Sequence, residues 1–209
     1  GWRDHPFLLK AMGDQKFCEG LNRIIFHLSA HQPYETMIPG LTHRKWGEHM
    51  QRHNTWWNYS GPWLEYLTRS QYLLQQGEFV ADVCYWFGEG APLNVNDMKL
   101  KLPPGYDFDF CSSEIVMQLR VQNGRLVLPS GASYRTLQLP ESDRMTLPLA
   151  RKIRDLVEGG ARVVGGKRPV GAPGLTDFPQ SDAEIEKIAK VLWDAGRVES
   201  GLTLADIFA

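Results

Sequence analysis

The segment Leu21-Asn-Arg-Ile-Ile-Phe-His-Leu28 decides the fold class of this chain. Its consecutive β-branched and aromatic residues, Ile24–Phe26, predict a strand that is buried on both faces. Residues 6–17 before it have the apolar spacing of a helix, and Gly20 marks the end of that helix. A helix followed at once by a doubly buried strand is typical of an α/β unit, so we expect an α/β protein.

A long irregular segment, residues 29–54, follows the predicted strand and is rich in His, Gln, Pro, Gly and Trp. Ordered loops of this length are usually functional, and this one leaves the carboxyl end of a strand, where α/β folds place their active sites. Five of the seven tryptophans lie in the first 63 residues, and five of the six histidines lie between residues 27 and 53. We therefore expect ligand binding or chemistry in the first third of the chain and a scaffold in the rest.

Helical and strand patterns cover most of the remaining chain. Residues 55–76 predict a helix with one buried face, which has either a kink at Pro62 or a short turn before it. Apolar spacing and turn residues predict the other elements, which are strands over residues 79–87, 134–139 and 161–164, a hairpin over 121–128, and helices over 112–120, 147–157 and 181–193. The strand, helix and strand within residues 134–164 form a parallel βαβ unit, and Ser181 with Glu184 has the spacing of a capping box.

Composition and charge exclude several classes of protein. The 209 residues are 43% hydrophobic and 22% charged, which is ordinary soluble usage and excludes disorder, collagen and coiled coils. A net charge of −1 argues against nucleic acid or an anionic membrane as a partner, and no apolar run approaches the roughly 18 residues that span a bilayer. Cys18, Cys84 and Cys111 form no CxxC pair, so we expect reduced and mostly buried thiols. The chain begins without Met, and we expect it to be a piece of a longer protein.

The first candidate site is the pair His27 and His31, at the end of the predicted strand. Imidazoles in this place can donate hydrogen bonds to a ligand hydroxyl or move a proton. A zinc site is a weaker alternative, because histidines four residues apart share one metal on a helix, and Pro33 and the strand pattern argue against a helix. A structural role for both imidazoles is the remaining alternative.

The second candidate site combines a carboxylate, a guanidinium, an amide and three indoles: Glu48, Arg52, Asn54, Trp46 and the adjacent pair Trp56 and Trp57. Sugar sites use this mixture, because aromatic faces stack on the C–H surfaces of a pyranose and polar side chains bond to its hydroxyls. Neighbouring residues on a helix cannot both face one way, so we expect one of the two indoles in the core and the other near the pocket. We also expect His27, His31 and Arg52 to converge on one surface patch.

Three acidic residues later in the chain are further candidates. Glu89 follows a predicted buried strand and is either a catalytic carboxylate or part of a turn at a domain junction, within a Gly- and Pro-rich linker over residues 88–105. Asp107 and Asp109 either hold a cation or bond to backbone amides before the helix that Ser112 begins, and we favour the second interpretation. The glycines match neither GxGxxG nor GxxxxGK[ST], so nucleotide binding is the weakest interpretation.

Several stretches of the chain resemble family 106 glycoside hydrolases, the α-L-rhamnosidases. They are Gly20–Pro33, Arg52–Trp57, Tyr72–Gly77, Gly88–Pro92, Pro104–Asp109 and Arg125–Tyr134. They occur in collinear order through nearly the whole chain, and their agreement is more specific than any one of them. The family's members are several times longer, with a catalytic (β/α)₈ barrel followed by a flavodoxin-like α/β domain and by β-domains.

This resemblance implies a domain organisation. Residues 1–77 would be the C-terminal portion of the TIM-barrel catalytic domain, with residues 21–28 as its last strand and residues 55–76 as its last helix. Residues 78–209 would be a truncated flavodoxin-like α/β domain. The fold expected from the resemblance is therefore the C-terminal part of a (β/α)₈ barrel followed by a flavodoxin-like domain.

The resemblance also implies a reaction, the hydrolysis of terminal α-L-rhamnosides with inversion, by two carboxylates near a Ca²⁺ ion. Both carboxylates are expected mainly on earlier strands, outside this chain; Glu48 lies in the right loop but matches no family carboxylate, and no Ca²⁺ ligand is identifiable. The chain alone is then expected to be inactive and prone to aggregate over residues 1–77. The expected partners are a rhamnose-containing oligosaccharide or glycoside and the rest of the parent polypeptide. The expected location of the protein is the periplasm or outside the cell. The alternative is a non-catalytic carbohydrate-binding or scaffold α/β module.

Overall fold

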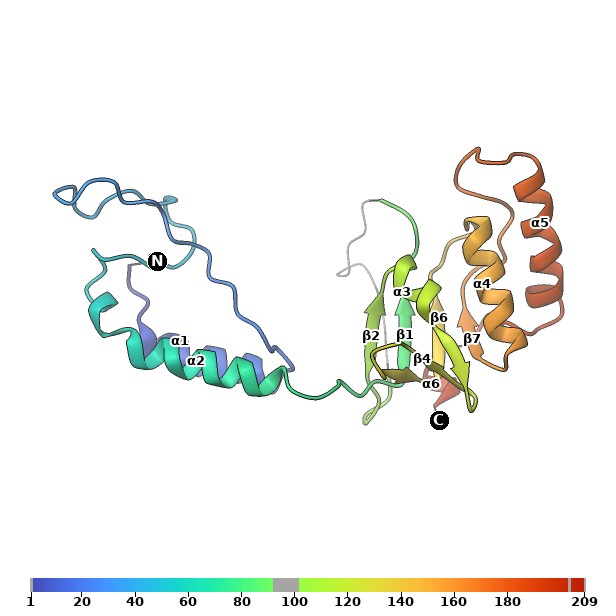
Figure 1. Ribbon diagram of the computed structural model, residues 1–209, viewed down its shortest axis with the longest axis horizontal. Coiled ribbons are helices and arrows are strands. Elements are labelled where there is room, and N and C mark those ends of the chain that lie inside the picture. Colours follow the sequence, from blue (N-terminus) through green and yellow to red (C-terminus); the bar gives the residue numbers. More distant parts are fainter. Residues whose placement is uncertain (1, 92–101, 203, 209) are drawn as a thin grey trace. The chain divides into compact units, whose positions relative to one another are not determined.

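Figure 1 shows the computed structural model of the chain, which describes residues 2–91, 102–202 and 204–208. The chain divides into two compact units, Gly1–Gly77 and Glu78–Ala209, here named unit 1 and unit 2. Within the described ranges, no helix is both long enough and apolar enough to cross a membrane. Residues 92–101 of the predicted linker lie outside the described residues.

Unit 1 is built on two helices, α1 (Pro6–Cys18) and α2 (Gly61–Leu74), which pack against each other (Figure 1). The Tyr66 hydroxyl of α2 donates to Asp14 Oδ1 of α1 at 2.5 Å. A short 3₁₀ turn, η1 (Trp57–Tyr59), precedes α2, and Pro62 lies in the first helical turn, where its missing N–H is not needed. The expected short turn before Pro62 is therefore confirmed.

The predicted strand at residues 21–28 does not form, and this expectation is wrong. A strand needs the backbone of a neighbouring strand, and residues 2–77 contain none. The segment instead bonds to other groups of unit 1: the Ile24 N–H donates to the Gln71 side-chain oxygen at 2.6 Å, and the Leu28 N–H donates to the Glu48 carbonyl at 3.3 Å. Ile25 is 84% exposed, so the segment is buried on one side only.

Unit 2 contains a four-stranded sheet in which every neighbouring pair is parallel and the order is β2–β1–β6–β7 (Figure 1). Its strands are β1 (Val83–Trp86), β2 (Phe108–Cys111), β6 (Thr136–Leu139) and β7 (Arg162–Gly165). The helix α4 (Leu147–Glu158) joins β6 to β7, which confirms the predicted parallel βαβ unit. The remaining helices are α3 (Ser113–Gln118), α5 (Gln180–Ala189), which continues into the π-helical turn η3 (Lys190–Asp194), and α6 (Leu204–Ile207).

The two faces of this sheet are covered by different elements, because alternate side chains of a strand point to opposite faces. One face carries Trp86 and Leu137 and packs against the apolar side of α4, where Leu149 and Ile153 are fully buried. The other face carries Val83 and Val164, which pack against Leu204 of α6. Burial of β1 from both faces explains why its sequence, Val-Cys-Tyr-Trp, is almost continuously apolar.

A small antiparallel sheet completes unit 2, with strands β3 (Arg120–Gln122), β4 (Arg125–Val127) and β5 (Ser133–Tyr134). Asn123 and Gly124 join β3 to β4 with φ angles of 51° and 73°. Positive φ at both central residues is the requirement of a type I′ turn, so the predicted hairpin is confirmed.

Three features of unit 2 differ from the sequence prediction. The sequence prediction assigned no separate strand to β2, and the predicted strand over residues 134–139 divides at Arg135 into β5 and β6 of separate sheets. The capping box is wrong: α5 begins at Gln180, its first turn is closed by backbone bonds from Ser181 to Asp177 and from Ala183 to Pro179, and Ser181 lies inside the helix. Glu184 instead accepts two hydrogen bonds from Arg151 of α4, at 2.7 and 2.6 Å, and forms an exposed bidentate ion pair with it.

Candidate functional site

The loop over residues 27–57 of unit 1 has no helix or strand before Trp57, as predicted, and side-chain hydrogen bonds hold it together. The Gln32 amide bonds to both the N–H and the carbonyl of Leu41. The amide of Gln51 donates to the Pro39 carbonyl at 3.0 Å. These bonds replace the ladder of a sheet, so the amide side chains of the loop are structural groups.

His27 and His31 both have exposed side chains. The Glu48 N–H donates to the His27 carbonyl at 2.6 Å, and the His27 imidazole lies edge-on to His43 with 5.8 Å between the ring centroids. Gly47 makes this approach possible, because a Cβ at that position would lie 1.8 Å from the His27 carbonyl oxygen. His31 directly precedes Gln32, whose carbonyl receives a hydrogen bond from Arg52.

Arg52 and Asn54 bond to the backbone of the loop. The exposed Arg52 guanidinium donates to the carbonyls of Gln32 and Tyr34 at 2.9 and 3.2 Å, all through Nη2. Asn54 is 5% exposed and donates to the His49 carbonyl at 3.2 Å. Arg52 therefore retains exposed donors for a ligand, whereas the amide of Asn54 is enclosed.

Trp56 and Trp57 both pack, partly buried, against the core of unit 1, which consists of Met50, Trp63 and Leu67. The Trp56 indole N–H donates to the Asp4 carbonyl at 2.8 Å, and its ring meets that of Trp63 at 89° with centroids 6.0 Å apart. Both indoles therefore contact the core, whereas we expected one of them in the core and the other near the pocket.

Glu48 is a partly buried carboxyl group in the middle of this loop. Burial raises the pKa of Glu48, and the carboxyl of Asp4, with which it forms a hydrogen bond, raises it further. A carboxyl group whose pKa is raised beside a second carboxylate has the property that a general acid requires. Asp4 was not predicted as a partner, because 44 residues separate it from Glu48 and no local pattern connects them.

The described residues do not provide a metal centre on their own. Ca²⁺ takes six to eight oxygen ligands, and no group of three or more His, Cys, Asp or Glu side chains that could hold a metal occurs in residues 2–91, 102–202 and 204–208. We therefore assign no residue of this part of the chain to Ca²⁺.

The acidic candidates of unit 2 have structural partners. Asp107 Oδ1 accepts from the Phe108 N–H at 2.8 Å, and Asp109 Oδ2 accepts from the Tyr134 hydroxyl at 2.9 Å, so the aspartates support the start of β2 and its link to β5 rather than the later helix. Burial, together with the hydrogen bond to Asp109, raises the pKa of Tyr134. Glu89 accepts from both the N–H and the hydroxyl of Thr146, at 2.7 and 2.8 Å, and thereby caps α4.

A family model described as alpha-L-rhamnosidase, that of glycoside hydrolase family 106, matches residues 1–207. The chain belongs to glycoside hydrolase family 106. A solved structure of a rhamnosidase from Novosphingobium sp. PP1Y is similar to this family 106 chain, with 36% sequence identity and a TM-score of 0.76 over 99% of the chain and 21% of that structure. A protein of Formosa agariphila named putative beta-glucuronidase is 40% identical over 199 residues, which are 95% of the family 106 chain and 17% of that protein. The chain thus spans about a fifth of the length of these relatives or less.

Proposed function

We propose that this chain is part of a glycoside hydrolase that hydrolyses terminal α-L-rhamnosides with inversion. The observation that carries the proposal is the family 106 match over residues 1–207, supported by the likeness to the Novosphingobium rhamnosidase at 36% identity. Because the chain spans only 21% of that structure, we further propose that the chain alone is inactive and works within a longer polypeptide.

We propose that unit 1 is the C-terminal portion of a (β/α)₈ barrel. The extended segment at residues 21–28 supports this assignment, since it lies between two helices and has no strand beside it within unit 1. Ile25, in this segment, is 84% exposed, and an apolar side chain of this kind is normally covered by neighbouring strands or helices. Barrel strands from the rest of the parent polypeptide would supply that cover.

We propose that unit 2 is a flavodoxin-like domain that supports the barrel. When the four parallel strands are numbered among themselves, their order is 2-1-3-4. That order is the beginning of the flavodoxin-like order 2-1-3-4-5, which supports the assignment.

The sugar site that we propose lies on the exposed side of the loop over residues 27–57. His27, His31 and the exposed donors of Arg52 would bond to sugar hydroxyls. Trp56 and Trp57 would provide the apolar wall, and the enclosed Asn54 would hold the loop in shape. Nucleic acid and membranes are not proposed as partners, in keeping with the net charge of −1.

Inversion needs a general acid and a general base roughly 6.5–9.5 Å apart, so that a water molecule fits between them. Glu48 is the candidate of this chain for one of the two, because burial and the Asp4 carboxyl favour its protonated form. The second carboxylate and the ligands of a Ca²⁺ ion would come from the rest of the parent polypeptide, which we place in the periplasm or outside the cell.

A second candidate substrate is a β-glucuronide, because the relative that is 40% identical is named putative beta-glucuronidase. The sugar of that substrate carries a carboxylate, which the guanidinium of Arg52 could pair with. A non-catalytic carbohydrate-binding or scaffold module is the alternative to both enzyme functions.

The test uses the complete parent polypeptide and compares release of p-nitrophenol from its α-L-rhamnoside and its β-D-glucuronide. Glu48→Gln should lower kcat about 10²–10⁴-fold, the usual contribution of a general acid or base. Glu35→Gln, a matched change at an exposed glutamate of the same loop, should not alter the rate. An unaltered rate in Glu48→Gln would show that Glu48 is not a catalytic group. Hydrolysis of the glucuronide alone would make a β-glucuronide the substrate in place of an α-L-rhamnoside. Binding of either glycoside without hydrolysis would favour the non-catalytic module.

A further inference from the structure

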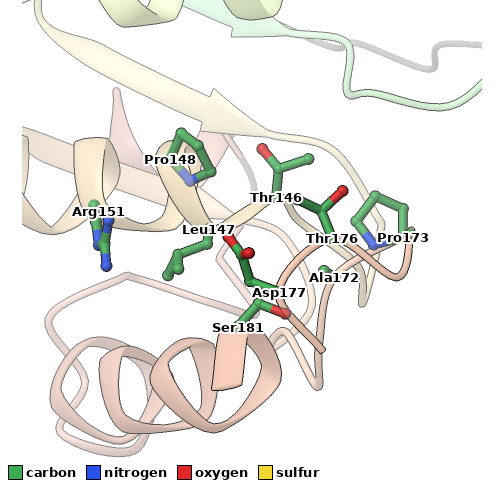
Figure 2. Close-up of a pocket in the computed structure, with 10 residues that line it drawn as sticks. Thr146, Leu147, Pro148, Arg151, Ala172, Pro173, Thr176, Asp177 and Ser181 are labelled. Carbon is green, nitrogen blue, oxygen red and sulfur yellow. The ribbon is translucent and has the colours of Figure 1, made fainter. Parts of the chain in front are cut away.

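Unit 2 contains a cavity of about 520 Å³ between the start of α4 and the loop that leads into α5 (Figure 2). The walls of the cavity include Thr146, Pro148 and Arg151 from the α4 side and Pro173, Thr176, Asp177 and Ser181 from the α5 side. The loops that carry these residues follow the carboxyl ends of β6 and β7. Parallel sheets place their ligand sites at this edge, and the volume is within the usual range for small-molecule sites.

Two smaller cavities, of about 460 and 290 Å³, adjoin the first and share Pro173 with it. The last of them is lined by residues 87–90 after β1 and by residues 140–142 after β6. The connection from β1 leads to β2 at one edge of the sheet, whereas the connection from β6 leads to β7 at the opposite edge. The hollow therefore extends to the place where the strand order reverses, which is the preferred position for a ligand in open α/β sheets.

Ser181 supplies an observation that points to a ligand. The residue is 3% exposed, it lines the largest of the three cavities beside Asp177 (Figure 2), and its Oγ has no hydrogen-bond partner among the residues that the structure describes. Buried hydroxyls are nearly always hydrogen-bonded, so a ligand bound in the cavity would supply the partner that the Ser181 hydroxyl lacks among the described residues. A serine hydroxyl turns about a single side-chain bond, so that it can meet a group bound against this wall of the cavity.

The charges around the cavity disfavour a phosphate or a nucleotide. The N-termini of two helices would ordinarily attract an anion, but the carboxylate of Glu89 already accepts from Thr146 at the start of α4. Asp182 in the first turn of α5 accepts from the Ala172 N–H at 2.9 Å. The cation in the wall, Arg151, is paired with Glu184 through two hydrogen bonds. Arg144 lines both smaller cavities, which also contain Asp182, Glu89 and Glu141. Together with Asp177, acidic side chains therefore outnumber cations around the hollow.

We infer that this cavity binds a neutral sugar residue. The hydroxyl groups of Thr176 and Ser181 can each donate or accept, and the Asp177 carboxylate accepts from sugar hydroxyls. The Thr146 hydroxyl, which donates to Glu89, can still accept. The apolar walls at Pro148 and Pro173 suit the C–H surface of a pyranose. This site lies in unit 2 and is separate from the sugar site proposed for unit 1, and it does not require the chain to be catalytic.

The probe is methyl α-L-rhamnopyranoside, added to the whole 209-residue chain at millimolar concentration. Amide chemical shifts in ¹H–¹⁵N NMR spectra are expected to change over residues 172–181 and around Thr146. D-Glucuronate and inorganic phosphate, which carry negative charge, are expected to leave these signals unmoved. Absence of binding by the rhamnoside, or stronger binding of phosphate at the same amides, would overturn the inference.

Two variants locate the binding. Ser181→Ala removes a hydroxyl without a partner and should not weaken folding, and Asp177→Asn keeps a residue type that tolerates the φ of 54° at this position. Each is expected to weaken rhamnoside binding about tenfold, as the loss of about 1.4 kcal/mol does. Asp155→Asn, a matched change on the exposed side of α4, should leave binding unaltered. Equal affinity in all three variants would place the bound sugar elsewhere, whether or not the parent polypeptide is a rhamnosidase.

Discussion

The two units of this chain bury their apolar side chains to very different degrees. Unit 2 has one continuous core between its sheet and α3, α4 and α5, and the central residues Leu137 and Ile153 are fully buried. Unit 1 has a small core at Met50, Trp63 and Leu67, while side chains as large as Phe7 remain 88% exposed. The hydrophobic effect is proportional to the apolar area removed from water, so unit 2 is stabilised by its own sequence and unit 1 lacks most of that stabilisation.

Hydrogen exchange should show the largest difference between the units. Amides of β1, β6 and β7 are expected to exchange only when unit 2 unfolds, whereas amides of residues 21–56 exchange through local opening. The free energies of opening should differ by about 5 kcal/mol or more, since a stable domain unfolds at about 5–15 kcal/mol and loosely packed loops open near zero. Peptide-level mass spectrometry measures both in one experiment, and equal protection would contradict the comparison.

A truncation in the core of unit 2 should have the next largest effect. Leu137→Ala creates a cavity at a fully buried position and is expected to lower the free energy of unfolding of unit 2 by about 2–5 kcal/mol. The measurement is a urea titration followed by hydrogen exchange of peptides from each unit. Leu67→Ala in α2 is the matched control and should leave the transition of unit 2 in place; a shift there would mean that the units unfold together.

Loss of a helix cap should have a smaller effect. Glu89→Ala removes the carboxylate that accepts two hydrogen bonds from Thr146, and we expect unit 2 to lose about 1 kcal/mol of stability, as other lost caps do. Scanning calorimetry of unit 2 measures the change. Glu141→Ala, at an exposed glutamate of the loop before α4, should have no effect; if both variants melt alike, the cap contributes nothing.

The smallest expected effect is on pH dependence. The Arg162 guanidinium, which donates to Glu199 at 2.8 Å through two nitrogens, holds the pKa of Glu199 below its ordinary value of 4.5. A carboxyl group whose folded-state pKa is depressed stabilises the fold above its unfolded-state pKa, and this contribution disappears as the pH falls through the folded-state value.

Arg162→Gln should therefore reduce the stability of unit 2 at neutral pH by about 0.2–1 kcal/mol and leave it unaltered in acid below the folded-state pKa. Urea titrations at several pH values test this, with Arg197→Gln as the control at an exposed arginine nearby. The same loss at every pH would show that the arginine acts through packing rather than through charge.

Elements with local signals were predicted well, and elements that need a partner were not. The turn before Pro62, the hairpin at Asn123-Gly124 and the βαβ unit around α4 follow from neighbouring residues, which set backbone angles or apolar spacing. The segment at residues 21–28 has a strong strand pattern, but it has no neighbouring strand in unit 1. The short edge strand β2 has a weak pattern and forms because β1 lies beside it.

The candidate site shows the same division. Sequence pattern identified the loop over residues 27–57 as rich in sugar-binding residue types, and the loop is irregular as expected. Sequence pattern did not identify the hydrogen bond of Glu48 to Asp4, or the capping of α4 by Glu89, whose partner is 57 residues away. It also misassigned Ser181, whose environment depends on the loop after β7.

The sequence by itself determined the family of this chain, its α/β character, the helices α2 and α4, and the tight turn at Asn123-Gly124. The family follows from the resemblance of several collinear motifs to family 106. The other features depend on apolar spacing and on the allowed backbone angles of single residues, which are local properties. Only the tertiary structure decided which strands pair, which carboxylates carry a hydrogen bond or a shifted pKa, and where a cavity with an unpartnered hydroxyl remains. Those properties depend on groups that are distant in sequence and close in space, because burial and hydrogen bonding act over a few ångströms whatever the separation along the chain.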